Sequence, residues 1–299
     1  MTVRPSFVSA VLLVSVLGIS LSGPLVRLSH APAIAIAVWR LAFSLVLIAI
    51  PLLWRGSWRQ WRTLDRSAAL TAVGGGALLA MHFWWWNTSI GLTTIAASVV
   101  LVNMQPVVVA ILSATWLREP PSQRQWFGIL VAMLGAVTVA APDLLRSGAQ
   151  SVRGSAALGD LLAIGGAITA AGYYVVGRRL RASLDLWAYV ALVYGACFVA
   201  LLIIAAVTRT PLAPYESRDF TIFALLALGP MMLGHTGLNW ALRYARAYQV
   251  NIVLLGEPIG AAFIAALLPS IRERPSLGTA LGGALILGGI VLAEQRSQS

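Results

Sequence analysis

A few polar side chains inside long apolar runs are the residues best placed to do chemistry. Glu257 is the only acidic side chain deep in such a run, and it directly precedes Pro258. Ionisable groups in apolar membrane segments are costly and mark functional sites by default. Burial favours the neutral form of a carboxyl group. Glu257 could therefore carry a coupled proton or bind the amino group of an amino acid. Alternatively, it is a helix-kink residue satisfied by backbone groups or by Arg40.

Arg40 is the one basic side chain within an apolar run, about seven residues from its start. Three roles are open for it. The side chain could snorkel to the outer interface, neutralise a carboxylate in the helix bundle, or bind a substrate carboxylate. The first two are structural, and they are favoured over the third.

Two histidines, His82 and His235, occupy matching places in the two halves of the chain. Imidazole can donate or accept a hydrogen bond and titrates near neutral pH. Trp86 and Asn239 follow at i+4 and share the helical faces of these histidines. We expect all four to line a substrate site. The alternatives are an interhelical hydrogen bond for each histidine and an interfacial aromatic belt for the tryptophans around Trp86.

Further candidates are polar side chains that give a pocket directional hydrogen bonds between apolar walls. Pro106 and Pro258 each remove a backbone donor, so we expect helix kinks or gating points there. For the polar residues the alternative is hydrogen bonding between helices. Gly74-Gly75-Gly76 could loosen one span. The polar candidates are Asn103, Asn251, Tyr173 and Tyr174.

Enzyme motifs are lacking. We find no His-Glu-x-x-His and no P-loop, and Gly18-Ile19-Ser20-Leu21-Ser22-Gly23 imitates a serine elbow poorly. The single thiol, Cys197, excludes an intrachain disulfide and a thiolate metal cluster. We therefore predict no catalytic residue, no metal and no cofactor.

The elements that position these residues are membrane spans. Of the 299 residues, 59% are hydrophobic and only 10% are charged, with a mean hydropathy of +0.84. A soluble domain averages about 45–50% apolar and about 25% charged residues. Runs of about 20 apolar residues predict ten transmembrane helices. They are 7–26, 33–53, 68–88, 94–117, 125–141, 158–177, 186–207, 220–241, 247–268 and 277–293. The Gly/Ser-rich segment 142–157 is expected to be a flexible loop.

The net charge of +11 comes from 21 arginines against 10 acidic residues. The arginines lie singly or in small groups between apolar runs, which argues against a nucleic-acid partner. With the N-terminus inside, the inner segments hold 13 arginines and the outer segments hold 7. The positive-inside rule therefore places both termini in the cytoplasm.

The two halves, 1–145 and 155–299, resemble each other. Leu117-Arg118-Glu119-Pro120-Pro121-Ser122 matches Ile271-Arg272-Glu273-Arg274-Pro275-Ser276 at an offset of 154. The match continues with Gly128 and Gly135, which correspond to Gly282 and Gly289 at the same offset, and with Pro106 and His82, which correspond to Pro258 and His235 with gaps of one or two residues. Because each half has five spans, corresponding helices cross the membrane in opposite directions. Such inverted repeats are typical of transporters whose substrate site lies near the midplane.

This pattern resembles the EamA-type members of the drug/metabolite transporter superfamily. The features are the five-plus-five spans, Arg40 early in the second, Pro106 and Pro258 in the fourth and ninth, and Glu119 closing the fourth. The tract around His82 is similar to the YddG-type branch of aromatic amino acid exporters. The resemblance implies an all-α basket of ten helices around a central cavity.

The function expected from these features is secondary export of amino acids, aromatic or hydrophobic, and related small metabolites. The two halves would rock around a central site in a bacterial inner membrane, with the chain a monomer. A broad exporter of hydrophobic cations is the alternative, with Glu257 as the charge partner and tryptophans as cation–π walls. An intramembrane enzyme is disfavoured by the missing motifs.

Overall fold

Each stretch that the sequence predicts to span a membrane contains helix within its described residues. The computed structural model describes residues 4–93, 95–147, 153–260 and 277–294, and these contain no β-strand. Helices satisfy every backbone group within one segment, as an apolar environment requires. The elements are α1 (Pro5–Ser20), α2 (Ser22–Leu28), α3 (Ala33–Trp54), η1 (Ser57–Thr63), α4 (Arg66–Leu92), α5 (Ile95–Val102), α6 (Gln105–Thr115), α7 (Gln123–Ser147), α8 (Arg153–Leu180), α9 (Leu186–Val207), α10 (Ser217–Leu226), η2 (Ala227–Thr236), α11 (Gly237–Ala241), α12 (Ala247–Val253), η3 (Leu254–Gly256) and α14 (Leu277–Glu294).

The described residues contain seven helical segments that are long and apolar enough to cross a membrane, from Pro5–Val26 to Ser217–Ala241. The fifth, ninth and tenth predicted spans are represented by α7, by α12 with η3, and by α14. Residues 261–268 of the ninth span and the polar repeat motif at 271–276 lie outside the described residues. The protein is thus an all-α membrane protein.

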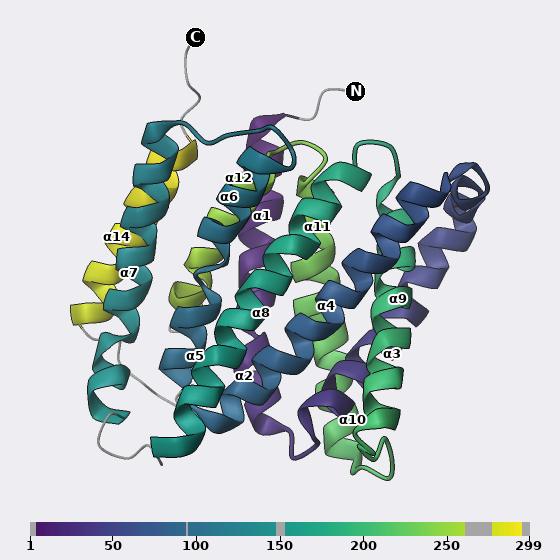
Figure 1. Ribbon diagram of the computed structural model, residues 1–299, viewed down its shortest axis with the longest axis horizontal. Helices are drawn as coiled ribbons and strands as arrows, with labels where there is room; N and C mark the ends of the chain where they lie inside the picture. The colour runs from purple at the N-terminus through teal and green to yellow at the C-terminus, as the bar shows by residue number, and fades with distance from the viewer. Residues whose placement is uncertain (1–3, 94, 148–152, 261–276, 295–299) are drawn as a thin grey trace.

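The helix pairs that pack together reveal the internal symmetry (Figure 1). The third span packs on the sixth (α4 on α8), and the first packs on the eighth (α1 on η2). Exchanging the two halves converts the first of these pairs into the second. The second span packs on the seventh (α3 on α9), and the fifth on the tenth (α7 on α14). Corresponding helices run in opposite directions, since α1 begins at the upper end of Figure 1 and α8 at the lower end.

The loop expected at 142–157 is shorter in the structure than the sequence predicts. The Gly/Ser-rich segment 142–157 is predicted as a loop, but α7 continues to Ser147 and α8 already begins at Arg153. A proline inside a membrane helix is tolerated when neighbouring groups satisfy the freed carbonyl. Pro142 and the small polar residues therefore do not end the helix here.

Four spans are interrupted instead of continuous, and each interruption precedes or includes a proline. The first breaks at Leu21 between α1 and α2, and the fourth at Asn103–Met104 between α5 and α6. The ninth turns from α12 into the 3₁₀ segment η3 just before Glu257. The eighth contains the π-helical segment η2 around Pro230. These interruptions bring side chains from several helices to the centre of the bundle.

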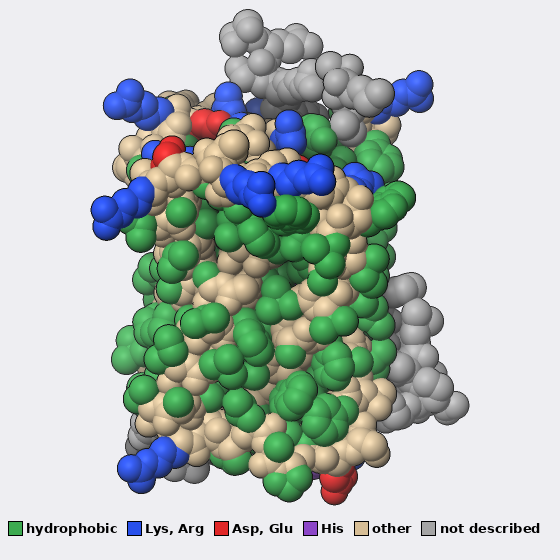
Figure 2. All heavy atoms as spheres, turned by 90° about the vertical axis from the view of Figure 1, so that its right-hand side faces the viewer, with side chains coloured by type: hydrophobic (Ala, Val, Ile, Leu, Met, Phe, Trp, Pro, Cys, Tyr) green, Lys and Arg blue, Asp and Glu red, His purple; other side chains and the backbone are tan. Residues whose placement is uncertain are grey.

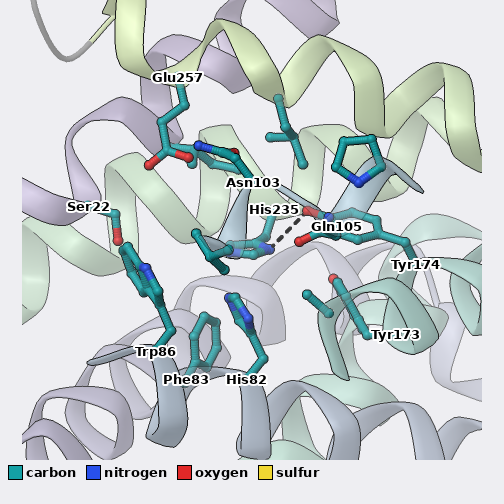
Figure 3. A pocket seen from close by; sticks show the side chains of 15 residues that line it. Ser22, His82, Phe83, Trp86, Asn103, Gln105, Tyr173, Tyr174, His235 and Glu257 are labelled. Atoms are coloured by element: carbon teal, nitrogen blue, oxygen red, sulfur yellow. Dashed lines mark hydrogen bonds between the residues drawn. The ribbon is translucent and has the colours of Figure 1, made fainter. Parts of the chain in front are cut away.

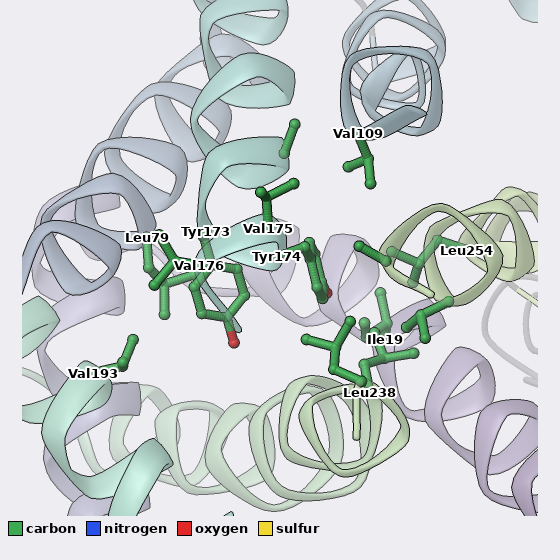
Figure 4. Packing of buried hydrophobic residues seen from close by; sticks show 14 of the residues in the cluster. Ile19, Leu79, Val109, Tyr173, Tyr174, Val175, Val176, Val193, Leu238 and Leu254 are labelled. Atoms are coloured by element: carbon green, nitrogen blue, oxygen red, sulfur yellow. The ribbon is translucent and has the colours of Figure 1, made fainter. Parts of the chain in front are cut away.

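Close helix packing explains two of the three consecutive glycines in the third span. The helix α4 is uninterrupted there. A Cβ at Gly76 would lie 2.6 Å from the backbone oxygen of Val193, and a Cβ at Gly75 would lie 2.7 Å from Val176. Gly74, in contrast, has nothing within 4 Å of such a Cβ. The surrounding cluster, with Leu79, Val176 and Val193, is shown in Figure 4.

Gly76→Val is therefore expected to destabilise the protein by about 1–3 kcal/mol or more, because overpacking meets backbone that cannot yield. Thermal unfolding of the purified protein in detergent would measure this loss. The neighbouring Gly74→Ala is the control and should leave the midpoint unchanged. Equal midpoints for the two variants would contradict the assigned packing role.

Candidate functional site

The interrupted helices surround a cavity near the middle of the bundle (Figure 3). Side chains from both halves line it, so it lies at the interface of the two repeats. Its wall combines aromatic rings with a few polar groups. The lining residues are Ile19, Ser22, His82, Phe83, Trp86, Val102, Asn103, Gln105, Pro106, Ala170, Tyr173, Tyr174, His235, Leu254 and Glu257.

Glu257 supplies the carboxylate of this cavity. Figure 3 shows it on one side, near Asn103, with His82 and Phe83 on the other. No hydrogen bond or ion pair of this carboxylate occurs among the residues that the structure describes. The Nδ2 atom of Asn103 and the Nε1 atom of Trp86 also lack partners there. The cavity thus offers a carboxylate and two donors that the described residues leave unused.

His82 is held in one orientation on the wall opposite Glu257. Its Nδ1 lies 3.0 Å from the carbonyl oxygen of Gly166 on α8. Because a carbonyl oxygen only accepts, Nδ1 carries the proton of a neutral ring and Nε2 is left as an acceptor. The ring stacks on Trp86, with centroids 6.1 Å apart and planes 3° from parallel. The i+4 spacing on α4 thus builds an aromatic wall.

His235 lies across Phe83 from His82. The edge of its ring meets Phe83 at 5.5 Å and 89°. Its Nδ1 lies 3.4 Å from the hydroxyl of Tyr174, the dashed line in Figure 3. Both histidines that the sequence singles out therefore reach the same cavity from opposite halves of the chain.

Asn239 does not line the cavity, although it follows His235 at i+4. Its Nδ2 donates to the hydroxyl of Tyr173 and, at 3.4 Å, to that of Tyr194. It also donates to the carbonyl of His235 at 2.8 Å. Asn239 is therefore a positioning residue that fixes Tyr173, and Tyr173 faces the cavity.

Gln105 and Asn251 join the two halves at the level of the interrupted helices. The Nε2 of Gln105 donates to the Oδ1 of Asn251, and both side chains are buried. Asn251 also donates to the carbonyl of Ala247 at 3.1 Å. Asn251 thus forms a hydrogen bond between helices, which was the alternative role considered for it. Gln105 also lines the cavity.

Arg40 lies behind the cavity wall and is fully buried. Its guanidinium carbon is 4.3 Å from the centroid of Phe83. None of its three side-chain nitrogens has a hydrogen-bond partner among the described residues. Arg40 therefore does not snorkel to the outer interface. It also forms no ion pair with a carboxylate of the described residues.

The consecutive tryptophans divide between two environments. Trp86 is buried and lines the cavity. Trp84 and Trp85 are only partly buried, as residues at the lipid boundary are. The aromatic-belt interpretation therefore fits Trp84 and Trp85, and Trp86 belongs to the cavity.

Phe83 and Ser22 are among the lining residues that were not singled out as candidates from the sequence. Phe83 separates Arg40 from the cavity, and Ser22 reaches it from the break between α1 and α2. The signal for Ser22 was available, because Gly23-Pro24 predicts an interrupted helix. Phe83 carried no such signal, since one phenylalanine in an apolar span looks like any other.

The cavity is narrow in this conformation. The centre of a water molecule can reach about 50 Å³ of it, which is room for a few waters. Pockets that enclose small-molecule ligands have volumes of about 300–1,000 Å³. A substrate larger than a few atoms therefore does not fit unless the cavity widens.

Comparison with known proteins adds three findings. A family model described as the EamA-like transporter family matches twice, at residues 7–141 and 157–294. An uncharacterized transporter of Archaeoglobus fulgidus is 24% identical over 272 residues, which cover 88% of this chain and 89% of that protein. A solved crystal structure superposes with a TM-score of 0.78 at 17% identity and covers 97% of both chains. The last finding bears on the fold alone.

Proposed function

Since the chain belongs to the EamA-like transporter family, we propose that it is a secondary transporter that exports amino acids, aromatic or hydrophobic, and related small metabolites. The proposal includes closeness to the YddG-type branch of aromatic amino acid exporters. It also includes proton coupling, or flow down the substrate gradient, as the driving force. The family membership itself makes the protein a membrane transporter, and the substrate is inferred from the cavity.

The observation that carries the substrate proposal is the composition of the cavity. A carboxylate (Glu257) lies opposite an aromatic wall of Phe83, Trp86 and His82. A carboxylate attracts the ammonium group of an amino acid, and aromatic rings bind apolar or aromatic side chains by stacking. The Nδ2 of Asn103 and the Nε1 of Trp86 have no partner among the described residues and are left to donate hydrogen bonds to the carboxylate of the ligand.

The inverted repeats support alternating access as the transport mechanism. The two halves, 1–145 and 155–299, meet at the cavity and run in opposite directions, so rocking one against the other exposes the site to either side in turn. The interrupted helices at Pro106 and Pro258 provide the points of bending. A single chain contains the complete pathway, and we propose that it acts as a monomer within the lipid bilayer.

Orientation is proposed from charge. Figure 2 shows basic side chains gathered at the upper end of this face, above a broad band of hydrophobic side chains. This is the end at which α1 begins. By the positive-inside rule, that end faces the cytoplasm of a bacterial inner membrane, with both termini on the same side.

The same cavity gives one alternative a specific basis. Glu257 together with Trp86 could bind a hydrophobic cation through charge and cation–π contacts. Such a ligand has no carboxylate, so it would make no use of donor groups in the cavity. The two proposed substrate classes, amino acids and hydrophobic cations, predict different inhibitors of transport.

Purified protein in liposomes tests the proposal. We expect labelled phenylalanine or leucine to cross faster than in empty vesicles, and unlabelled amino acids to inhibit this flux more strongly than tetraphenylphosphonium does. Stronger inhibition by the lipophilic cation would support the alternative. Flux equal to that of empty vesicles for every amino acid would overturn the substrate proposal.

A further inference from the structure

A basic groove lies far from the central cavity, at the end of the bundle where α1 begins. It is formed by the end of α3, the start of η1, the α8–α9 turn and the region after α11. Three arginines and three tryptophans dominate its lining. They are Arg55, Arg181, Arg243, Trp54, Trp187 and Trp240.

The positive charge of this groove is not neutralised within the described residues. Arg55 and Arg243 are exposed and form no ion pair there. Arg181 is buried and uses its guanidinium on the backbone carbonyls of Asn239, at 3.0 Å, and Leu184. Burial, and then the charge of Arg243, lower the pKa of Arg181 to about 10, so Arg181 remains cationic at neutral pH.

The one carboxylate in the groove is already engaged. Asp185 accepts from the backbone nitrogen of Ala188 at 2.9 Å, where it caps the start of α9. It also accepts from the Nε2 of Gln60 at 2.6 Å. Like charges held near one another without an ion pair favour an anionic ligand from outside the chain.

The groove opens toward the bilayer. Trp54 is 83% exposed, directly after a column of exposed apolar side chains on α3 that includes Val46 and Ile50. Exposed apolar columns that end in tryptophan are typical of the lipid-facing surface at the interface with water. In Figure 2 the basic side chains of this face lie just above its hydrophobic band.

We propose that this groove binds the phosphate of an anionic phospholipid, with the arginines contacting the headgroup and the tryptophans contacting the upper acyl chains. Basic pockets between transmembrane helices on the positively charged side recognise such headgroups. A free anion would leave the apolar and aromatic surface beside the arginines uncovered, whereas the acyl chains of a lipid would bury it. We therefore propose a lipid as the ligand.

Binding of dioctanoyl phosphatidylglycerol to the full chain in detergent tests this proposal, by native mass spectrometry and by the shift in thermal unfolding. We expect Arg55→Gln/Arg243→Gln to weaken binding about tenfold or more, since each arginine near a headgroup contributes about 1 kcal/mol. Arg181 is left intact because it holds backbone carbonyls. The matched control, Arg209→Gln/Arg218→Gln, removes the same charge from exposed positions at the opposite end and should bind within twofold of the unmodified protein.

Native mass spectrometry counts lipid on folded protein alone, so a loss of stability in the groove variant would not mimic loss of binding. Equal binding by the two double variants would overturn the proposal. So would equal binding of dioctanoyl phosphatidylcholine, which has no net charge. Inorganic phosphate that protects the protein at the concentrations effective for the lipid would instead assign the groove to a free anion.

Discussion

Glu257→Gln is expected to reduce amino acid export by about 100-fold while the protein remains folded. The carboxylate faces the cavity and has no partner among the described residues, so the ammonium group of a substrate is its proposed partner. Removing one member of a buried, hydrogen-bonded charge pair costs about 2–5 kcal/mol, and each 1.4 kcal/mol is about tenfold in affinity. Glutamine keeps the shape and loses the charge.

Initial rates of uptake into liposomes, measured with the thermal unfolding midpoint of the same preparation, would check this prediction. The midpoint should stay the same or rise, because a buried carboxyl group is removed without breaking a protein hydrogen bond. Glu216→Gln, an exposed substitution at the start of α10, is the control and should transport normally. A Glu257→Gln variant with the rate of the unmodified protein would exclude Glu257 from substrate binding.

The sequence predicts the helices well because their signal is long and simple. A run of about 20 apolar residues can satisfy its backbone only as a helix, and all ten runs contain helix. The segment 142–157 was less predictable, since small polar residues are compatible with a helix end as well as with a loop. Composition alone does not decide between the two.

The site was predicted in part, and its limits have a physical cause. The i+4 relation on the regular helix α4 brings His82 and Trp86 to one wall. The same relation for His235 and Asn239 starts within the π-helical segment η2, where the 3.6-residue period no longer applies. Asn239 therefore faces the tyrosine hydroxyls of Tyr173 and Tyr194. No pattern in the local sequence predicts a π-helix.

The environment of Arg40 could not be predicted from the sequence, because the group that contacts its guanidinium is the face of an aromatic ring. A sequence can suggest that a buried arginine seeks a carboxylate, but it cannot show that Phe83 covers the guanidinium instead. Contacts between side chains far apart in sequence depend on the packed fold. Phe83 contacts the buried guanidinium on one side and lines the cavity as well.

Arg40→Met is expected to leave thermal stability unchanged or raise it, and to lower export of amino acids at least tenfold. A buried guanidinium without a protein partner is costly, and an apolar side chain of similar volume often replaces such a charge at no loss. The contact with Phe83 offsets only part of this cost, since a desolvated cation–π contact is worth about 2 kcal/mol. Arg40 is thus retained at a cost in stability, which suggests a functional role.

The role we propose is to place a positive charge behind Phe83, close enough to the cavity to attract the carboxylate of a bound amino acid. Transport of a substrate with a carboxylate should therefore depend on Arg40, whereas transport of tetraphenylphosphonium should not fall in Arg40→Met. Measuring both fluxes on one preparation separates substrate binding from folding. If both fluxes and the unfolding midpoint fall together, Arg40 stabilises the bundle and does not act on the substrate. If amino acid flux alone falls, the two charged groups within the spans act at the two ends of a single zwitterionic ligand.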